Sequence, residues 1–185
     1  MRVITGTARG RRLLTLEGDD VRPTTDIVKE ALFSIIQFEI EGRKILDLFG
    51  GCGQLAIEAL SRGAHSAVIV DASKKSIEVI KKNLETTGFS KQAVVLNTDA
   101  VSFLTRRTEK YDIAFIDPPY SVGLLEKALL KISDVMNEGG VVICEAPFKD
   151  EVPETAGTFR LQKKYRYGKT GLFVYRFDEE GNDAE

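Results

Sequence analysis

A rigid turn near residue 117 carries side chains that could hold a ligand. The run 111–116 is apolar enough for a buried strand, and it ends at Asp117-Pro118-Pro119-Tyr120. Proline lacks a backbone N–H and has a fixed φ, so two consecutive prolines end a strand and stiffen the turn after it. A carboxylate, backbone carbonyls and an aromatic ring are thereby held in place. We expect this turn to bind a ligand rather than to be only a stiff loop.

A glycine-rich loop follows an earlier apolar segment, residues 44–49. Three glycines between positions 50 and 53 let the backbone approach a ligand closely. Residues 51–56 fit the G-x-G-x-x-G/A pattern of dinucleotide-binding proteins, and Asp71 follows about twenty residues later, as that pattern requires. The pattern alone is weak, and it leaves both a dehydrogenase and a purely structural turn open.

Acidic residues end three successive strand-like segments. Asp47 lies just before the glycine loop, and Asp71 and Asp99 end the next two segments. Ligands of parallel sheets bind beyond the carboxyl ends of the strands. A carboxylate beside the loop would repel a pyrophosphate but attract a sulfonium with an α-amino group, and the other two could accept hydrogen bonds from ribose hydroxyls and an adenine amine. The acids therefore favour S-adenosylmethionine over a dinucleotide.

The Asp-Pro-Pro-Tyr turn suits methylation of an exocyclic amine on a nucleobase. A dehydrogenase would leave this turn unexplained. The lone pair of such an amine is delocalised into the ring, which makes it a poor nucleophile. Asp117 and the carbonyl of Pro118 can accept its hydrogens and favour the reactive form, while Tyr120 can stack on the base. This chemistry needs no metal, and the spacing of Cys52 and Cys144 is not that of metal ligands.

Strand-like and helical segments alternate along most of the chain, which predicts a doubly wound α/β fold with a mainly parallel sheet covered on both faces. Strands are expected at 44–49, 66–71, 92–99, 111–117 and 140–147, with helices at 54–63, 73–88, 100–107 and 123–140. Two more strands, at 158–168 and 170–177, are close enough to form a terminal antiparallel hairpin. In front of the sheet, residues 3–16 are expected to form a β-hairpin and residues 24–38 a helix.

Positive charge gathers toward the two ends of the chain, although the net charge is −2. The first twelve residues contain four arginines and no acid, and the segment 160–176 is also basic without an acid. Together they could form a footprint for a polyanion, and solvated surface charge is an equal alternative. The chain has no apolar run of membrane-spanning length and no signal-peptide core, so we expect a cytoplasmic protein without a membrane partner.

The sequence resembles, nearly from end to end, the RsmD family of bacterial 16S ribosomal RNA guanine-N2 methyltransferases. The segments that carry the resemblance are "RVITGTARGRRL" (2–13), "RPTTDIVKEALF" (22–33), "DLFGGCGQLAIEALSRGA" (47–64) and "DPPY" (117–120). The last motif alone is shared by DNA and protein N-methyltransferases, whereas the others are more specific. The chain departs from the usual family pattern at Ile27, Lys29, Gly50 and Cys52.

The resemblance implies a class I methyltransferase fold and methyl transfer from S-adenosylmethionine, giving S-adenosylhomocysteine, to the N2 amine of a guanine in 16S ribosomal RNA. The alternative is an amino-methyltransferase that acts on DNA, at adenine N6 or cytosine N4, or on another RNA. For DNA, so short a chain has little room for a target-recognition region. An assembly factor without turnover is disfavoured by the intact Asp-Pro-Pro-Tyr turn. The expected partner is a 30S subunit or an assembly intermediate, and the expected oligomeric state is a monomer.

We expect an RNA-facing extension (1–40), a catalytic domain (41–177) and, from the acidic composition of the last residues, a disordered tail (178–185). We assign cofactor binding to Asp47, Phe49, Gly51, Gly53, Asp71, Asp99 and Ala100. The expected catalytic residues are Asp117, Pro118, Pro119 and Tyr120. The residues expected to face RNA are Arg2, Arg9, Arg11, Arg12, Arg22 and Lys29. No metal is expected.

Overall fold

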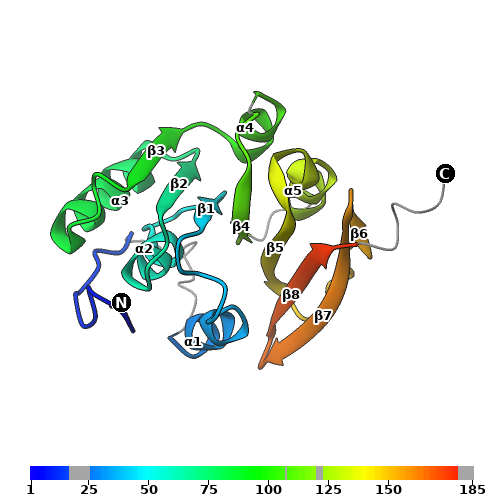
Figure 1. Ribbon diagram of the computed structural model, residues 1–185, viewed down its shortest axis with the longest axis horizontal. Coiled ribbons are helices and arrows are strands. Elements are labelled where there is room, and N and C mark those ends of the chain that lie inside the picture. The colour runs from blue at the N-terminus through cyan, green and yellow to red at the C-terminus, as the bar shows by residue number, and fades with distance from the viewer. Residues whose placement is uncertain (17–25, 107, 120–122, 179–185) are drawn as a thin grey trace.

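The apolar strands of the sequence form one eight-stranded sheet with the order β3-β2-β1-β4-β5-β8-β7-β6 (Figure 1). The computed structural model describes residues 1–16, 26–106, 108–119 and 123–178. The strands are β1 (Lys44–Asp47), β2 (Ser66–Asp71), β3 (Ala93–Asn97), β4 (Tyr111–Ile116), β5 (Met136–Pro147), β6 (Thr155–Ala156), β7 (Phe159–Tyr167) and β8 (Thr170–Phe177). The helices are α1 (Asp26–Ile35), α2 (Gln54–Ser61), α3 (Lys74–Thr87), α4 (Ala100–Arg106) and α5 (Leu124–Ile132), the last followed by a 3₁₀ turn, Ser133–Val135.

The five strands from β1 to β5 are parallel, and the last three strands pair antiparallel at the β5 edge. From β1 the chain builds outward through β2 to β3, and it then returns to place β4 on the other side of β1. The winding therefore reverses between β1 and β4. Open α/β sheets bind their ligands beyond the carboxyl ends of the strands at such a point.

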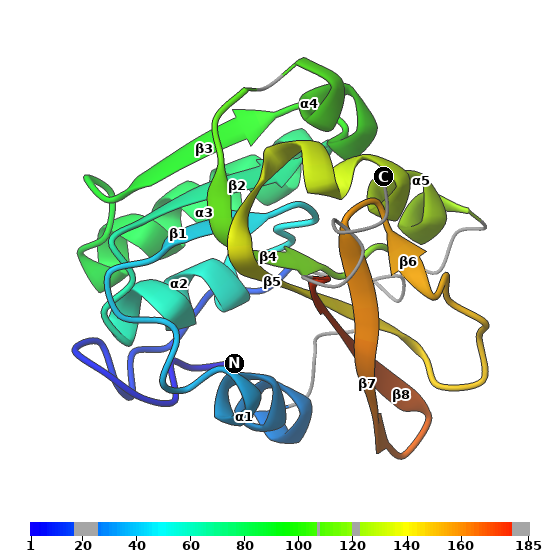
Figure 2. The same ribbon diagram turned by 45° about the vertical axis from the view of Figure 1, so that its right-hand side comes forward.

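Helices cover both faces of the sheet, with α1, α2 and α3 on one face and α4 and α5 on the other (Figure 2). Each face has its own apolar cluster, because successive strand residues point to opposite sides. In β4, for example, Ile113 and Phe115 belong to the first cluster, and Ala114 and Ile116 belong to the second. None of the described helices is long and apolar enough to cross a membrane.

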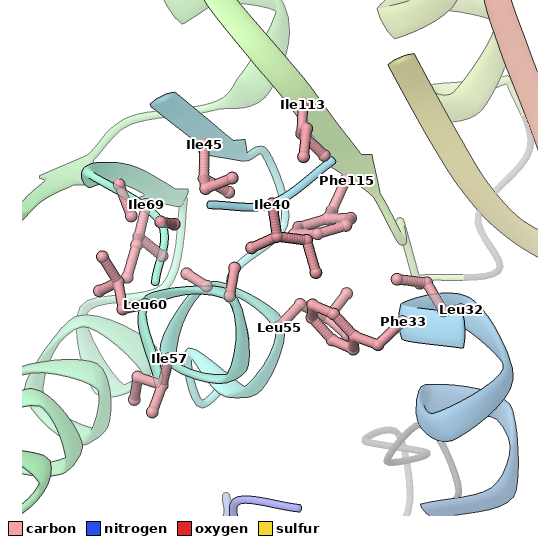
Figure 3. Close-up of a cluster of buried hydrophobic side chains, with 14 of the residues drawn as sticks. Leu32, Phe33, Ile40, Ile45, Leu55, Ile57, Leu60, Ile69, Ile113 and Phe115 are labelled. Atoms are coloured by element: carbon pink, nitrogen blue, oxygen red, sulfur yellow. The ribbon is translucent and has the colours of Figure 1, made fainter. Parts of the chain in front are cut away.

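The N-terminal extension packs onto the first of these clusters. Figure 3 shows Leu32 and Phe33 of α1 beside Leu55 of α2 and Phe115 of β4. The rings of Phe33 and Phe115 meet edge to face, with centroids 5.7 Å apart. This contact is a favourable aromatic geometry. The extension therefore shares its hydrophobic core with the sheet that follows it in sequence.

The structure corrects two of the expected elements. The predicted helix 123–140 ends early, and β5 already begins at Met136, because Met136 pairs with Tyr111 at the start of β4. The predicted N-terminal hairpin is reduced to one antiparallel bridge between Arg2 and Arg12. Three backbone hydrogen bonds still cross the segment, from the N–H groups of Val3, Gly10 and Leu13 to the carbonyls of Arg11, Val3 and Met1. Further bonds tie the segment to α2 and α3. The short strand β6 was not predicted.

Candidate active site at the carboxyl ends of the parallel strands

A cavity of about 500 Å³ opens at the carboxyl ends of the parallel strands, where the winding reverses. It brings together residues from the glycine loop, from the ends of β1 and β2, from the start of α4 and from the turn after β4. The predicted site residues that line it are Asp47, Phe49, Gly51, Asp71, Asp99, Ala100, Asp117, Pro118 and Pro119. Tyr120 and Arg22 lie outside the described residues.

The glycine loop forms the wall of the cavity between β1 and α2. A Cβ on Gly51 would meet no atom closer than the Phe49 carbonyl at 4.0 Å, so a ligand can approach this part of the backbone. Gly53 does not line the cavity; it precedes α2 with a positive φ of 80° and therefore shapes the turn. Gly50 is one of the departures from the usual family pattern. A Cβ at this position would lie only 2.4 Å from Ile69 Cγ2, so the neighbouring Ile69 side chain leaves room for glycine alone.

Asp47 is the most buried acid of the cavity, with 1% of its surface exposed. Its carboxylate accepts a 3.3 Å hydrogen bond from the Ala56 N–H in the first turn of α2. Burial raises the pKa of Asp47 to about 7, and the nearby charge of Asp71 acts in the same direction. A cation bound beside Asp47 would favour its ionised form.

Asp71 ties the glycine loop to the end of β2. One carboxylate oxygen accepts from the Gly51 N–H and the other from the Ser73 N–H, both at 2.8 Å. The helix cap of α3 is Ser73 and not Asp71, because the Ser73 side chain accepts from the Ser76 N–H. Asp71 therefore holds the ligand-facing loop in shape, and each of its oxygens retains capacity for another hydrogen bond.

Asp99 has a structural role as well as a place in the cavity wall. Its carboxylate accepts from the Ser102 N–H at 2.8 Å, as an N-terminal cap of α4 does. Hydrogen bonds to the Ser102 backbone and side chain lower the pKa of Asp99 and keep it ionised. Asp99 thus caps α4 and lines the cavity at the same time.

Gln54 was not predicted as a site residue, although it lines the cavity at the first position of α2. Only 8% of its surface is exposed, and its side-chain oxygen has no hydrogen-bond partner. A buried acceptor without a partner costs free energy, on the order of 1 to 3 kcal/mol. A ligand that donates a hydrogen bond here would remove this cost. The available sequence signal was a polar residue directly after the glycine loop.

The turn after β4 separates the cavity from a second hollow of about 350 Å³. Pro118 and Pro119 line both spaces, and so does Glu145 near the end of β5. Asp117 is half-buried and lines the first space. A larger hollow of about 700 Å³ includes Lys110 and Asn137, and it lies at the amino ends of β4 and β5, away from all predicted site residues.

Four of the arginines expected to face RNA are exposed on the N-terminal segment, namely Arg2, Arg9, Arg11 and Arg12. The residues Met1, Thr15 and Leu16, which flank these arginines, line the cavity. The segment runs beside α2 (Figure 1, blue). Arg2, which is bridged to Arg12, therefore adjoins a cavity-lining residue. Arg9 follows Ala8, which bonds to Ser61 at the far end of α2 from the glycine loop.

The prediction that Lys29 faces RNA is wrong. Its side chain is fully buried, its ammonium donates to the Arg2 carbonyl at 2.7 Å, and it lies 3.8 Å from a carboxylate oxygen of Glu58. Burial lowers the pKa of Lys29, an effect that Glu58 opposes. Lys29 therefore stabilises the packing of the extension on α2. Its helical neighbour Ile27 is the exposed one, with 70% of its surface accessible.

Glu58, on α2, binds the backbone of the N-terminal segment. Its two carboxylate oxygens accept from the N–H groups of Ile4 and Thr5 at 2.7 and 2.9 Å, and Arg62 pairs with it at 2.9 Å.

Among the described residues, no cluster of three or more His, Cys, Asp or Glu side chains could hold a metal ion.

Comparison with known proteins places this site in a family. The model of a family described as conserved hypothetical protein 95 matches residues 1–176. Ribosomal RNA small subunit methyltransferase D of Escherichia coli is 32% identical over 188 aligned residues, covering 100% of this chain and 94% of that protein. The chain belongs to the RsmD family.

Other members of the RsmD family and its solved structures agree with this placement. YlbH of Bacillus subtilis, described as a candidate rRNA methyltransferase, is 41% identical and covers 95% of this chain and 98% of its own. The solved structure of yhhF from Escherichia coli, described as a candidate methyltransferase, superposes with a TM-score of 0.87 at 31% identity, covering 97% of this chain and 99% of that one. The predicted methyltransferase fold is confirmed.

Proposed function

We propose that this protein transfers a methyl group from S-adenosylmethionine to the exocyclic N2 amine of a guanine in 16S ribosomal RNA. The observation that carries the proposal is that one cavity joins the strand-end acids to the Asp117-Pro118-Pro119 turn. Membership of the RsmD family supports the choice of RNA as substrate, because the Escherichia coli relative is named a small-subunit ribosomal RNA methyltransferase.

The cavity fits S-adenosylmethionine in size and in the chemistry of its walls. A volume of about 500 Å³ lies within the usual range for small-molecule sites. The open space above Gly51 admits the ligand to the backbone, and the unpartnered oxygen of Gln54 calls for a donor. Asp47 offers negative charge to a sulfonium or an α-ammonium, and Asp71 and Asp99 offer acceptors to hydroxyl and amino groups.

When bound, S-adenosylmethionine supplies an electrophilic methyl group. The protein's task is then to place the acceptor amine and to make its lone pair available. Asp117 and the Pro118 carbonyl would accept the hydrogens of the amine and stabilise the positive charge that develops on it. The two prolines hold these acceptors rigidly, and Tyr120 would stack on the base that the turn receives.

The exposed arginines of the N-terminal segment would bind the phosphate backbone of the RNA. Their positive charge positions the substrate without reading its sequence. They lie on the segment whose flanking residues Met1 and Leu16 line the cavity, so a phosphate bound there would lie near the target base. We propose a 30S subunit or an assembly intermediate as the substrate and a monomer as the active form.

The test uses labelled S-adenosylmethionine and 30S subunits from a strain that lacks the activity. We expect label in N2-methylguanosine with the wild-type protein and a loss of at least about 100-fold with Asp117→Ala, because the amine loses its principal acceptor. Cofactor binding by the variant, measured by calorimetry, serves as the control for folding. Cofactor binding without label in ribosomal RNA would contradict the proposal, and DNA would then be tested as the substrate.

A further inference from the structure

We propose that Glu145 selects guanine by accepting a hydrogen bond from the ring N1–H of the target base. The inference rests on the proposed function and deepens it, because it assigns base recognition to a residue outside the Asp-Pro-Pro-Tyr turn. Glu145 would touch the substrate directly, beside the amine that Asp117 holds.

The sheet places Glu145 next to the turn that follows β4. Strands β4 and β5 are parallel, with Ile116 paired to Cys144, so Asp117 and Glu145 are the next residues along two neighbouring strands. Residues at equivalent positions of parallel neighbours point to the same side of the sheet. Both side chains line the cavity that we assign to the reaction.

Glu145 also forms part of the wall between the two spaces on either side of the turn. Together with Pro118 and Pro119 it lines both the cavity and the second hollow, and only 9% of its surface is exposed. Its position suits contact with a base inserted from the second hollow toward the methyl donor.

The second hollow is acidic, which indicates what kind of group it can receive. Besides Glu145 it is lined by Glu126, Asp150 and Glu151, and none of its described lining residues is a lysine or an arginine. Such a surface repels phosphate and favours a group rich in hydrogen-bond donors. A nucleobase edge with adjacent N–H groups meets this requirement, whereas the RNA backbone does not.

Guanine is the base whose amine adjoins a second donor. Its N2 amino group lies next to N1–H, whereas the amines of adenine and cytosine lie next to a ring nitrogen that is an acceptor. An ionised carboxylate is acceptor-only, so Glu145 beside the amine would bind guanine and would repel the other two bases. A site built to bond a donor strongly rejects an analogue that lacks it, by a larger factor than apolar pockets achieve.

The test is the substitution Glu145→Gln, which keeps the size of the side chain and adds a donor. The substrates are reconstituted 30S subunits with either guanine or 2-aminopurine at the methylated position. The second base has the same amine beside a ring nitrogen that accepts. We expect the variant to lose about 100-fold in kcat/KM on guanine and its preference for guanine over 2-aminopurine to fall at least tenfold, because the amide can donate to that nitrogen.

Glu138→Gln is the matched control, since Glu138 is an exposed acid at the other end of the same strand. We expect it to keep both the rate and the base preference. The preference ratio does not depend on the fraction of folded variant, and calorimetry with S-adenosylmethionine checks folding independently. An unchanged preference in Glu145→Gln would overturn the inference. Failure of the proposed function would instead appear as no N2-methylguanosine from the wild-type protein.

Discussion

At the scale of single residues, Asp47 shows a conflict between stability and ligand binding. Its carboxyl group is 1% exposed, and burial raises its pKa to about 7 from an ordinary value of 3.8. The folded protein therefore holds a proton that the unfolded chain has lost between these pH values. The contribution of Asp47 to stability is largest at acidic pH and falls as the pH rises toward about 7. A bound cation would compensate for this cost.

Cofactor binding is accordingly expected to depend on pH through Asp47. Below about pH 7 the free protein must release the Asp47 proton before it can attract a cation, so affinity falls with the pH. We expect S-adenosylmethionine to bind roughly tenfold or more weakly at about pH 5.5 than at about pH 7.5, as measured by calorimetry. Asp47→Asn is expected to bind weakly at both values, and a pH dependence that survives this change would contradict the assignment.

The same variant gives a stability measurement. Asparagine carries no charge and can still accept from the Ala56 N–H, so Asp47→Asn removes the cost of burying an ionised group. The quantity to compare is the unfolding free energy of the variant minus that of the wild type. We expect this difference to increase by on the order of 2 kcal/mol from pH 5 to pH 8. Denaturant unfolding without cofactor measures this difference, and a parallel pH dependence of the two proteins would refute it.

Gln54 presents a related case without a charge. Its buried oxygen has no partner, so Gln54→Met should leave the stability of the free protein unchanged or raise it by about 1 kcal/mol. If the oxygen bonds the cofactor, the same change weakens S-adenosylmethionine binding by roughly tenfold. Thermal unfolding with and without cofactor separates the two effects. Gln92→Met, on the loop before β3 outside the cavity lining, is the control.

At the scale of elements, α2 anchors the N-terminal segment to the sheet. The Glu58 carboxylate accepts from the segment's backbone, Ser61 Oγ accepts from the Ala8 N–H and donates to the Thr5 carbonyl, and Asn83 of α3 bonds both backbone groups of Leu14. These bonds add to the few backbone hydrogen bonds that the segment makes with itself. Because Met1 and Leu16 line the cavity, the anchor also supports one of its walls.

Removal of this anchor should destabilise the protein strongly. Glu58→Ala leaves the buried Lys29 ammonium without its carboxylate and two backbone N–H groups without acceptors. We expect a loss of about 3 to 5 kcal/mol in unfolding free energy, as for other broken buried pairs. Glu78→Ala, an exposed acid on α3, should change stability by less than about 0.5 kcal/mol. Similar losses in both variants would show that the anchor does not have this role.

At the scale of the whole molecule, the two basic segments lie at different parts of the fold. The N-terminal segment lies beside α2, whereas β7 lies near the antiparallel edge of the sheet (Figure 1). The footprint for a polyanion that both segments could form is therefore divided. β7 exposes Lys163 and Lys164 near the sheet edge, a placement that also discourages edge-to-edge pairing of sheets.

This arrangement predicts unequal contributions to RNA binding. Replacement of Arg9, Arg11 and Arg12 by alanine should weaken binding to 30S subunits and reduce the slope of log affinity against log salt by about 0.7 to 0.9 per lost phosphate contact. Lys163→Ala with Lys164→Ala should leave the slope nearly unchanged. Binding titrations at several salt concentrations measure the affinity and its salt slope for both sets of variants. A larger effect of the lysine pair would show that the RNA binds along β7 instead.

The order of strands and helices could be predicted from the sequence because it depends on local patterns. Apolar runs such as 66–71 and the capped helix that ends at Gly88 carry their periodicity and end signals within a few residues. The acids Asp47, Asp71 and Asp117 could be predicted as neighbours for the same reason, since the carboxyl ends of parallel strands meet at one edge. The family resemblance then indicated the chemistry.

The tertiary structure decided what depends on partners distant in the sequence. Lys29 reads as a surface charge, and it is buried only because Glu58 and the Arg2 carbonyl receive its ammonium. Glu145 reads as the end of an apolar strand, and the pairing of β5 with β4 brings it beside Asp117 in the cavity. Local sequence patterns specify which helices and strands form. The burial of a side chain and the identity of its neighbours arise from contacts between elements. These contacts decide which polar residues stabilise the fold and which face the ligand.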